Sequence, residues 1–428
     1  MQNARLAPWL LAPCAALLLF LAIPSRGASV AEAPKAGEGS VASVISGTSA
    51  VEAAEPVAAS LAPPSPATQA VLGAMSYDAA RGRFVAPYGP GKATLTISPR
   101  IQQGLEKLLS EYRVPVAAAV LVEVRTGRVI ALAERDERGR GRGVSLQPIA
   151  PAASVFKIVT SAALLERGIT PESEICFHGG KHRIQKALLA DNPRRDRRCL
   201  TLANALGKSA NVVFAKLAGR ELSRELLRDE ATRFLFDAPI PFEWPVEPSR
   251  AQIPSEPFEL ATTAAGFGAV RLSPLHGALI ASIVANGGQL VAPRVIDSVD
   301  GAPLPPVAAP RRLVTPEVAA ALATMMRTTV TDGTARKVFR RDRWSRRSPL
   351  REVTVAGKTG SLSDASPFKD YSWFVGFAPV EDPQIAVAAV VVNDRLWRVK
   401  APFVAREALS AYFAAEDAAP KGTRTASR

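Results

Sequence analysis

Three short motifs in a fixed order constrain the fold of this 428-residue chain more than any other feature. They are Ser154-Val-Phe-Lys157, Ser209-Ala-Asn211 and Lys358-Thr-Gly360. At average composition, an S-x-x-K sequence arises by chance on the order of once in a chain of this length. A second copy does occur, at Ser366-Pro-Phe-Lys369. Each motif alone is therefore weak, and the ordered set of three is informative.

The first motif has the spacing of a nucleophile and its base. Ser154 and Lys157 lie one turn apart on the same face of a predicted helix. Ser154 falls near the start of that helix, where free N–H groups and the helix dipole favour a developing alkoxide. The apolar neighbours Phe156 and Ile158 indicate burial, and a buried Lys157 with a lowered pKa can accept the serine proton. The second S-x-x-K copy contains Pro367 in a loop-like setting, so we interpret it as a decoy.

The second motif supplies a hydroxyl and an amide. Ser209 could relay a proton to a leaving amine, and Asn211 could hold a peptide amide of a substrate. Taken alone, a serine–asparagine turn between two helices would be the better interpretation.

The third motif follows a strand-like segment, residues 353–356. On an edge strand, Lys358 and the Thr359 hydroxyl can face a groove and bind a carboxylate, while Gly360 lets the substrate backbone approach. We expect the backbone N–H groups of Ser361 and Ser154 to form an oxyanion hole.

The N-terminus indicates export. Residues 6–23 form an apolar run that fits either a retained membrane anchor or a cleaved signal peptide within residues 1–27, and we favour the anchor. The following residues, 28–90, are rich in Ala, Pro and Ser and predict a disordered tether, with order expected to begin in its last part, Tyr77 to Tyr88. We expect one folded domain over residues 91–415 and a polar tail over 416–428.

Export places Cys176 and Cys199 in an oxidising compartment, on either side of an Arg-rich stretch with His178 and His182. A disulfide is the simplest account of the pair. Zinc binding is an alternative, although Cys176 and His178 are too close to match common zinc patterns. Two free thiols are the other alternative.

The periodicity predicts an α+β fold in which helices pack on an antiparallel sheet. A hairpin is followed by a block of helices and then by a strand meander. We predict helices at 100–112, from Ser154 onward, 200–226, 260–286 and 402–415, and strands at 95–97, 116–124, 128–133, 290–296, 353–356, 372–378 and 384–392.

The net charge of +14 has three interpretations. We exclude nucleic acid as a partner because the basic residues are scattered and no aromatic–basic motif accompanies them. Attraction to anionic lipid headgroups or wall polymers is one remaining interpretation, and compositional drift is the other.

With these motifs, residues 93–413 resemble the transpeptidase domain of penicillin-binding proteins. Further segments that resemble this family are Gly266-Phe-Gly268, Asp332-Gly-Thr-Ala335 and Trp373-Phe-Val-Gly376. The resemblance implies a serine peptidoglycan D,D-transpeptidase without cofactor or metal, acylated by β-lactams, with its catalytic domain outside the plasma membrane. It assigns Ser154, Lys157 and Ser209 to catalysis, and Asn211, Lys358 and Thr359 to the substrate. Stem peptides, and other cell-wall synthesis proteins, are the partners implied.

Three other functions remain open at this stage. A D,D-carboxypeptidase or endopeptidase would act on the same substrate, and a β-lactam sensor would use the same acylation. A class D-like β-lactamase shares Phe156-Lys157 and Trp373-Phe374. It is disfavoured because such enzymes have an apolar residue at the place of Asn211, and because Glu166 lies about 18 Å along the helix from Ser154.

Overall fold

The computed structural model describes residues 71–418, except 138–142, 245, 366–367 and 397. Its helices are α2 (Pro99–Glu111), α3 (Lys157–Glu166), α4 (Lys186–Leu189), α5 (Leu202–Gly207), α6 (Asn211–Glu221), α7 (Arg224–Arg233), α8 (Pro257–Ala264), α9 (Pro274–Ala285), α10 (Pro316–Thr331), α11 (Arg336–Trp344) and α12 (Ala401–Ala418), with 3₁₀ turns η1 (Val144–Leu146) and η2 (Ala153–Phe156).

The strands are β1 (Ser76–Asp78), β2 (Arg83–Tyr88), β3 (Gly91–Leu95), β4 (Val116–Glu123), β5 (Val129–Asp136), β6 (Ala150–Pro151), β7 (Glu174–Phe177), β8 (Arg198–Thr201), β9 (Arg250–Ala251), β10 (Val270–Leu272), β11 (Gln289–Leu290), β12 (Ile296–Val299), β13 (Ala302–Pro303), β14 (Arg311–Arg312), β15 (Ala356–Ala365), β16 (Phe368–Ala378) and β17 (Ile385–Asn393).

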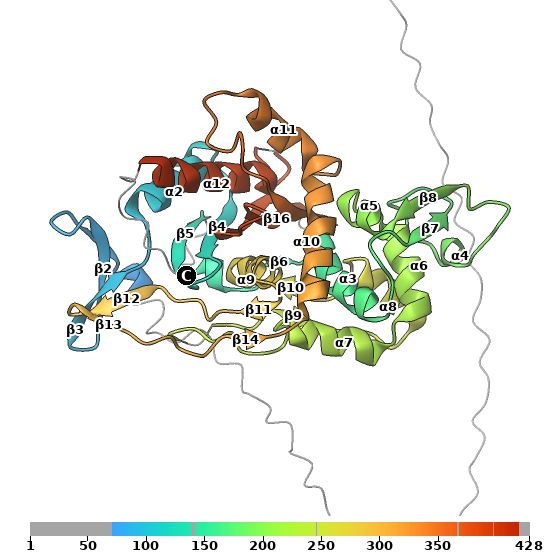
Figure 1. The fold of residues 1–428 in the computed structure, drawn as a ribbon, viewed down its shortest axis with the longest axis horizontal. Coiled ribbons are helices and arrows are strands. Elements are labelled where there is room, and N and C mark those ends of the chain that lie inside the picture. Colours follow the sequence, from blue (N-terminus) through green and yellow to red (C-terminus); the bar gives the residue numbers. More distant parts are fainter. Residues whose placement is uncertain (1–70, 138–142, 245, 366–367, 397, 419–428) are drawn as a thin grey trace, which may run out of the picture. The chain divides into compact units, whose positions relative to one another are not determined.

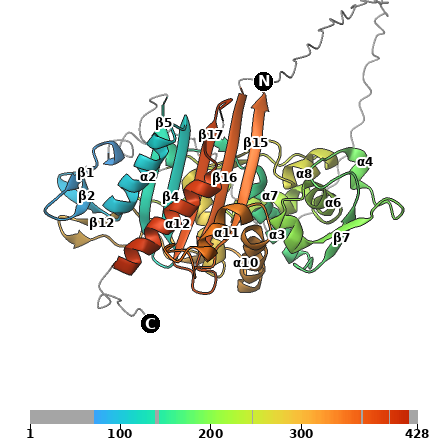
Figure 2. The ribbon, with the colours of Figure 1, turned by 90° about the horizontal axis from the view of Figure 1, so that it is seen from above.

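A five-stranded antiparallel sheet, ordered β15-β16-β17-β4-β5, forms the centre of the fold. Successive residues of β4 alternate between two hydrophobic clusters, as the period of two in a strand requires. Helix α9 packs on one face, and α2 and α12 pack on the other. Figure 2 shows the strands side by side with α12 across them. The α+β prediction is confirmed, and β15, which carries the third motif, is an edge strand.

Serine or threonine followed by proline starts three of the helices. Ser273 caps α9 and Thr315 caps α10 through side-chain oxygens that accept backbone N–H bonds. Ser98 precedes α2, which matches the helix predicted over 100–112, but its side chain makes no capping bond; its backbone carbonyl accepts from the N–H of Gln102 instead.

The last part of the predicted tether, where the sequence indicated that order begins at Tyr77, is folded. Strands β1 and β2 lie within it, and β2 pairs with β3 in a second sheet, ordered β1-β2-β3-β12-β13. Phe84, Val85 and Ala86 of β2 are buried, so the folded domain begins before residue 91. The predicted anchor and the rest of the tether lie outside the described residues, as does most of the polar tail.

Several predicted elements are interrupted in the structure. Residues 200–226 contain β8 residues and then α5, α6 and the start of α7, while α8 and α9 are separated by β10. The single strand expected at 290–296 divides into the ends of β11 and β12, which belong to different sheets. The strand expected at 353–356 begins only at Ala356.

The helical block α3, α5, α6, α8 and α10, labelled in Figure 1, lies beside the β15 edge of the central sheet, which Figure 2 shows. The first and second motifs belong to this block, so the active-site candidates meet where helices border the edge strand. Within the described part of the chain, no helix is long and apolar enough to cross a membrane.

Candidate active site

Ser154 lies in the 3₁₀ turn η2, immediately before α3, which begins at Lys157. The preceding residue, Ala153, has φ of +49°, a left-handed conformation that is unfavourable for a residue with a side chain. Gly266 packs against this turn, and a Cβ there would lie 2.5 Å from the Ala153 carbonyl oxygen and 2.9 Å from the Ser154 nitrogen. A glycine at 266 is therefore needed for the close contact that supports the nucleophile.

The Lys157 ammonium is fully buried and has three oxygen partners. Its Nζ lies 2.8 Å from Ser154 Oγ, 2.8 Å from Asn211 Oδ1 and 2.5 Å from the carbonyl oxygen of Ala265. Burial, followed by the positive charge of Lys358, lowers the pKa of Lys157 well below its usual value.

These partners define where the lone pair of a neutral Lys157 points. A neutral amine has two N–H donors and one lone pair, whereas an ammonium has three donors. The carbonyl oxygens of Asn211 and Ala265 can only accept, so they take the two N–H groups. The lone pair is left facing the Ser154 hydroxyl, which is the arrangement needed for proton abstraction.

The second motif forms the junction between α5 and α6. Ser209 has φ of +52°, and its strained backbone brings its hydroxyl to 3.1 Å from Lys358 Nζ. Asn211 begins α6 and is held at both ends of its amide: Oδ1 accepts from Lys157, and Nδ2 donates to the His182 carbonyl at 2.8 Å. Asn211 therefore orients Lys157, a role the sequence did not suggest.

Lys358 differs from its predicted arrangement. The sequence suggested an ammonium facing a substrate carboxylate, but the side chain is fully buried and donates to Ser209 Oγ and, at 2.7 Å, to the Thr359 carbonyl. Burial lowers the pKa of Lys358 to about 7. Its first contacts are thus inside the protein, and its charge is placed beside the serine of the second motif.

Gly360 also has a packing role, and its expected role in letting the substrate backbone approach stays a prediction. A Cβ at this position would lie 3.1 Å from Trp373 Cβ, 3.3 Å from the Ala152 carbonyl oxygen and 3.3 Å from Val155 Cγ2. The glycine is therefore required for packing β15 against the turn that carries the nucleophile. The indole Nε1 of Trp373 donates to the carbonyl of Pro151 at 2.9 Å and ties the same turn to β16.

One cavity of about 300 Å³ connects the motifs. Its lining includes six residues singled out from the sequence, namely Ser154, Ser209, Asn211, Thr359, Gly360 and Ser361. The structure adds six that were not predicted as site residues, namely His182, Thr334, Ser372, Trp373, Lys400 and Pro402. Ser154 and Ser361 both border the cavity, and their roles as oxyanion-hole donors remain a prediction.

Two of the added residues could have been suspected. Thr334 Oγ1 lies 2.6 Å from Thr359 Oγ1, and it belongs to the Asp332–Ala335 segment that resembled the family. His182 was considered only as a zinc ligand. Burial, and then the charges of Lys181 and Lys157, lower the pKa of His182, which favours a neutral imidazole in the cavity wall. The Ala265 carbonyl, in contrast, has no sequence signal.

Cys176 and Cys199 form a disulfide that joins the paired residues of β7 and β8. The disulfide prediction is confirmed, and the zinc and free-thiol alternatives are wrong. No group of three or more His, Cys, Asp or Glu suited to a metal ion occurs among residues whose positions are described. Ser366 of the second S-x-x-K copy lies outside those residues, and its Lys369 pairs with Asp364 in the β15–β16 ladder.

Comparisons with known proteins agree with this geometry. Residues 117–409 match the family model of the penicillin binding protein transpeptidase domain. The chain is 28% identical to the peptidoglycan D,D-transpeptidase PbpA of Mycobacterium tuberculosis over 351 residues, which cover 72% of this chain and 68% of that protein.

Solved structures of the mycobacterial protein are also similar. The crystal structure of PBPA from Mycobacterium tuberculosis matches with a TM-score of 0.60 and 27% identity, covering 76% of this chain and 81% of that one. Its imipenem acyl-enzyme complex matches with a TM-score of 0.58 and 26% identity, covering 75% and 79%. The chain belongs to the penicillin-binding protein transpeptidase family of serine acyltransferases.

Proposed function

We propose that this protein is a peptidoglycan D,D-transpeptidase that cross-links stem peptides through an acyl-enzyme on Ser154. The observation that carries the proposal is the placement of Lys157 Nζ between the Ser154 hydroxyl and two pure acceptors. This arrangement gives a serine nucleophile with a lysine base at neutral pH.

The acylation step follows from these contacts. Ser154 Oγ attacks the carbonyl carbon of the penultimate D-alanine as its proton passes to the Lys157 amine. The negative charge on the carbonyl oxygen is stabilised by the backbone N–H groups of Ser154 and Ser361. When the peptide C–N bond breaks, the proton held by Lys157 is relayed to the departing D-alanine nitrogen; the relay proposed is the Ser209 hydroxyl, which lies 3.1 Å from Lys358 Nζ and borders the same cavity as Ser154.

The second step transfers the acyl group. An acceptor amine attacks the ester carbonyl, its proton returns through Lys157 to Ser154 Oγ, and a new peptide bond replaces the ester. A β-lactam enters by the same first step, but its opened ring stays attached to the acyl group. We therefore propose β-lactams as covalent inhibitors, in line with the imipenem acyl-enzyme complex of the mycobacterial relative.

Slow hydrolysis of the acyl-enzyme distinguishes this function from a β-lactamase. No Asp or Glu is among the described residues that line the cavity, so a carboxylate base for water is missing there. Glu166 lies at the far end of α3 and pairs with Arg233 instead. A β-lactamase that uses a carboxylate side chain as its deacylating base is accordingly disfavoured.

The disulfide supports a location on the export side of the membrane, since disulfides persist in oxidising compartments. We propose that residues 6–23 tether the domain to the plasma membrane, and that other cell-wall synthesis proteins act beside it.

Two measurements on the full chain test the function. The first is the lifetime of the penicilloyl adduct, which should be hours; a lifetime below a second would indicate a β-lactamase. The second follows a D-Ala-D-Ala stem peptide with an added amine acceptor. A cross-linked product supports transpeptidation, and release of D-alanine without it, at every acceptor concentration, would indicate a carboxypeptidase.

A further inference from the structure

The segment closed by the disulfide, residues 177–198, carries an unusual concentration of positive charge. We call it the disulfide loop. Its seven cationic residues are Lys181, Arg183, Lys186, Arg194, Arg195, Arg197 and Arg198, and its only acidic residues are Asp191 and Asp196.

Both acidic residues form contacts that hold the disulfide loop against helix α6. The Asp196 carboxylate is buried and bonds the His178 ring at 2.5 Å, Lys216 Nζ at 3.0 Å and the Asn192 N–H at 2.9 Å. Burial alone would raise the pKa of Asp196, but these hydrogen bonds outweigh it and hold the pKa well below its usual range. Asp196 is therefore ionised and neutralised locally.

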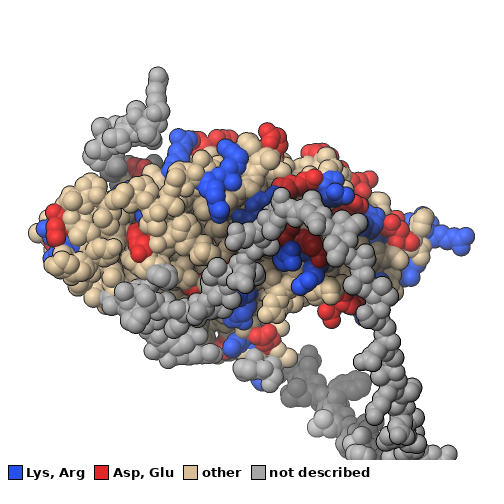
Figure 3. Space-filling model, turned by 90° about the horizontal axis from the view of Figure 1, so that it is seen from below, with Lys and Arg blue, Asp and Glu red and all other residues tan. Residues whose placement is uncertain are grey.

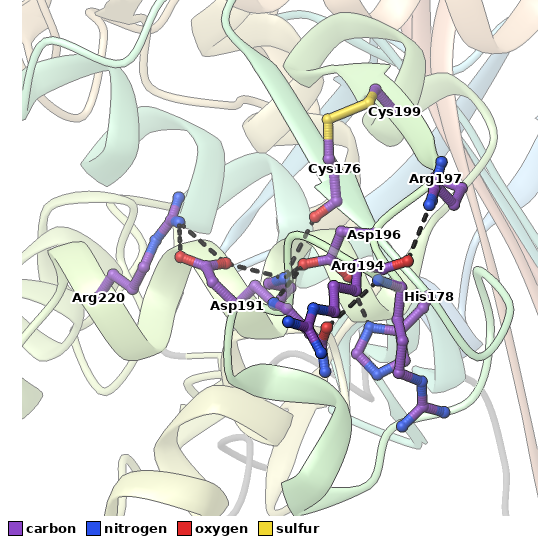
Figure 4. Close-up of polar contacts among 11 residues, drawn as sticks. Cys176, His178, Asp191, Arg194, Asp196, Arg197, Cys199 and Arg220 are labelled. Carbon is purple, nitrogen blue, oxygen red and sulfur yellow. Dashed lines mark hydrogen bonds and ion pairs between the residues drawn. A yellow bond between two sulfur atoms is a disulfide. The ribbon is translucent and has the colours of Figure 1, made fainter.

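Lys216 is the centre of this support. Its side chain is fully buried on α6 and also contacts Asp191 at 2.9 Å and the Cys176 carbonyl at 3.2 Å. Arg220, one turn further along α6, pairs with Asp191 at 3.1 Å. Figure 4 shows how these contacts gather beneath the disulfide. The two carboxylates thus have cationic partners on α6, and neither neutralises the loop's own cations.

The seven cations of the loop are all exposed. Within the part of the chain that the structure describes, none of them forms an ion pair with a carboxylate; Arg197 Nε, for example, donates to the backbone carbonyl of Arg194. Positively charged side chains protrude in Figure 3 from the end of the molecule that α4, β7 and β8 form in Figure 1. The loop therefore presents a positive surface on a fixed support.

This surface is continuous with the active site. The His182 side chain lines the cavity between Lys181 and Arg183, and its carbonyl accepts the amide of Asn211. The Lys181 carbonyl accepts the N–H of Val212 at 3.2 Å. His182 therefore brings the disulfide loop to the cavity wall, and its neighbours in sequence, Lys181 and Arg183, are exposed cations.

We propose that the disulfide loop is a docking surface for the free carboxylates of a peptidoglycan strand whose stem peptide occupies the cavity. The proposal rests on the proposed function and names a substrate class for it: polymeric strands with carboxylate-bearing stems. Charge complementarity and continuity with the cavity favour this occupant. A membrane surface is disfavoured because none of the exposed large hydrophobic residues of the described chain belongs to the loop.

The test compares two matched variants of the full chain. In the loop variant, Arg194, Arg195, Arg197 and Arg198 are replaced by Gln. In the control variant, four exposed arginines in and after α11 are replaced by Gln, namely Arg340, Arg341, Arg346 and Arg347. The total charge removed is equal, but the control residues do not line the cavity.

Binding of soluble, uncross-linked peptidoglycan strands is measured in a Ser154→Ala background, which prevents acylation and leaves the cavity open to the stem peptide; penicillin labelling is measured separately on each variant with Ser154 intact. We expect the loop variant to bind at least about tenfold more weakly at 0.15 M salt, with a shallower salt dependence, while the control stays within twofold. Amidation of the free carboxylates should weaken wild-type binding as much as the loop substitutions do.

The opposing outcomes are distinct. Equal losses in both variants, or no loss in the loop variant, would overturn the proposal. Full binding of amidated strands would show that the loop does not recognise carboxylates. Loop-dependent binding to phosphatidylglycerol vesicles, without binding to strands, would show that the loop binds a membrane surface. Penicillin labelling in the loop variant shows that its catalytic site is assembled. Failure of penicillin to label the wild type would refute the proposed function, whereas the binding comparison tests the docking surface separately.

Discussion

Replacement of Lys358 by Met tests how the third motif acts on the nucleophile. The substitution keeps an unbranched side chain in a fully buried position and removes its ammonium. The lost contacts are those to Ser209 Oγ at 3.1 Å and to the Thr359 carbonyl at 2.7 Å.

The magnitude follows from the contact to Ser209. A hydrogen bond from a charged group contributes about 1.5–3 kcal/mol. Since each 1.36 kcal/mol changes a rate tenfold, Lys358→Met should slow acylation by about 10- to 150-fold when Lys358 is charged. With a pKa of about 7, Lys358 is charged below pH 7 and largely neutral at pH 8.5. The loss should therefore be larger at pH 6 than at pH 8.5.

The same change acts on the base. The charge of Lys358 is one of the two causes that lower the pKa of Lys157. Its removal should raise that pKa, so the acid limb of the acylation profile should move to higher pH. The assay is stopped-flow acylation by a chromogenic cephalosporin between pH 5 and 9, with thermal melting to confirm folding.

A uniform loss at all pH values, or a shift of the acid limb to lower pH, would contradict this reasoning. A β-lactam with an esterified carboxylate provides a second arm. If Lys358 acts through Ser209 and Lys157, esterification should slow the wild type and Lys358→Met by the same factor. If esterification and the substitution have non-additive effects on the acylation rate, Lys358 contacts the ligand carboxylate directly, as the sequence suggested.

Three further changes have predicted outcomes. Thr334→Val removes the 2.6 Å contact to Thr359 Oγ1 and should slow β-lactam acylation by about 3- to 10-fold, since a neutral hydrogen bond contributes about 0.5–1.5 kcal/mol; an unchanged rate would remove Thr334 from the site. Replacing Cys176 and Cys199 by Ser opens a link across 23 positions and should cost about 3 kcal/mol, or about 5 °C by calorimetry, and no change in melting temperature would refute the estimate. Burial raises the pKa of Glu230 from 4.5 to about 7, so folding stability falls as pH rises through this interval. The free energy of unfolding of Glu230→Gln should exceed that of the wild type by up to about 3 kcal/mol at pH 8 and equal it at pH 4. A variant that is less stable than the wild type at pH 8 would contradict a raised pKa for Glu230.

The sequence predicted correctly those elements whose signals lie within a short stretch of the chain. The helix predicted over 100–112 corresponds to α2, and the strands predicted over 116–124 and 128–133 form the β4–β5 hairpin. The spacing of Ser154 and Lys157 required only one turn of chain, and the disulfide required only two cysteines in an exported segment.

The errors arose where distant segments decide the structure. The start of the folded domain was placed at residue 91, after β1 and β2, because these short strands lie in a segment of tether-like composition and β1 pairs with β2 and β2 with β3. The helical segment expected over 200–226 is interrupted at Ser209, which has a positive φ of 52°. Ala265 reaches Lys157 across 108 residues through a backbone carbonyl, which no side-chain pattern can reveal.

The partner of Lys358 was missed for the same reason. Its hydrogen bond to Ser209 spans 149 residues and joins two motifs that were each interpreted as facing the substrate. The motifs identified the right residues, and the packing of the edge strand β15 against the helical block determined which of them contact one another.

Mass-spectrometric mapping of the penicillin adduct on the full chain tests the central claim most directly. The account predicts a single acyl group on the peptide that contains Ser154, no adduct in Ser154→Ala, and an unchanged adduct in Ser366→Ala. An adduct on Ser366, or labelling that survives in Ser154→Ala, would contradict the assignment of Ser154 as the nucleophile.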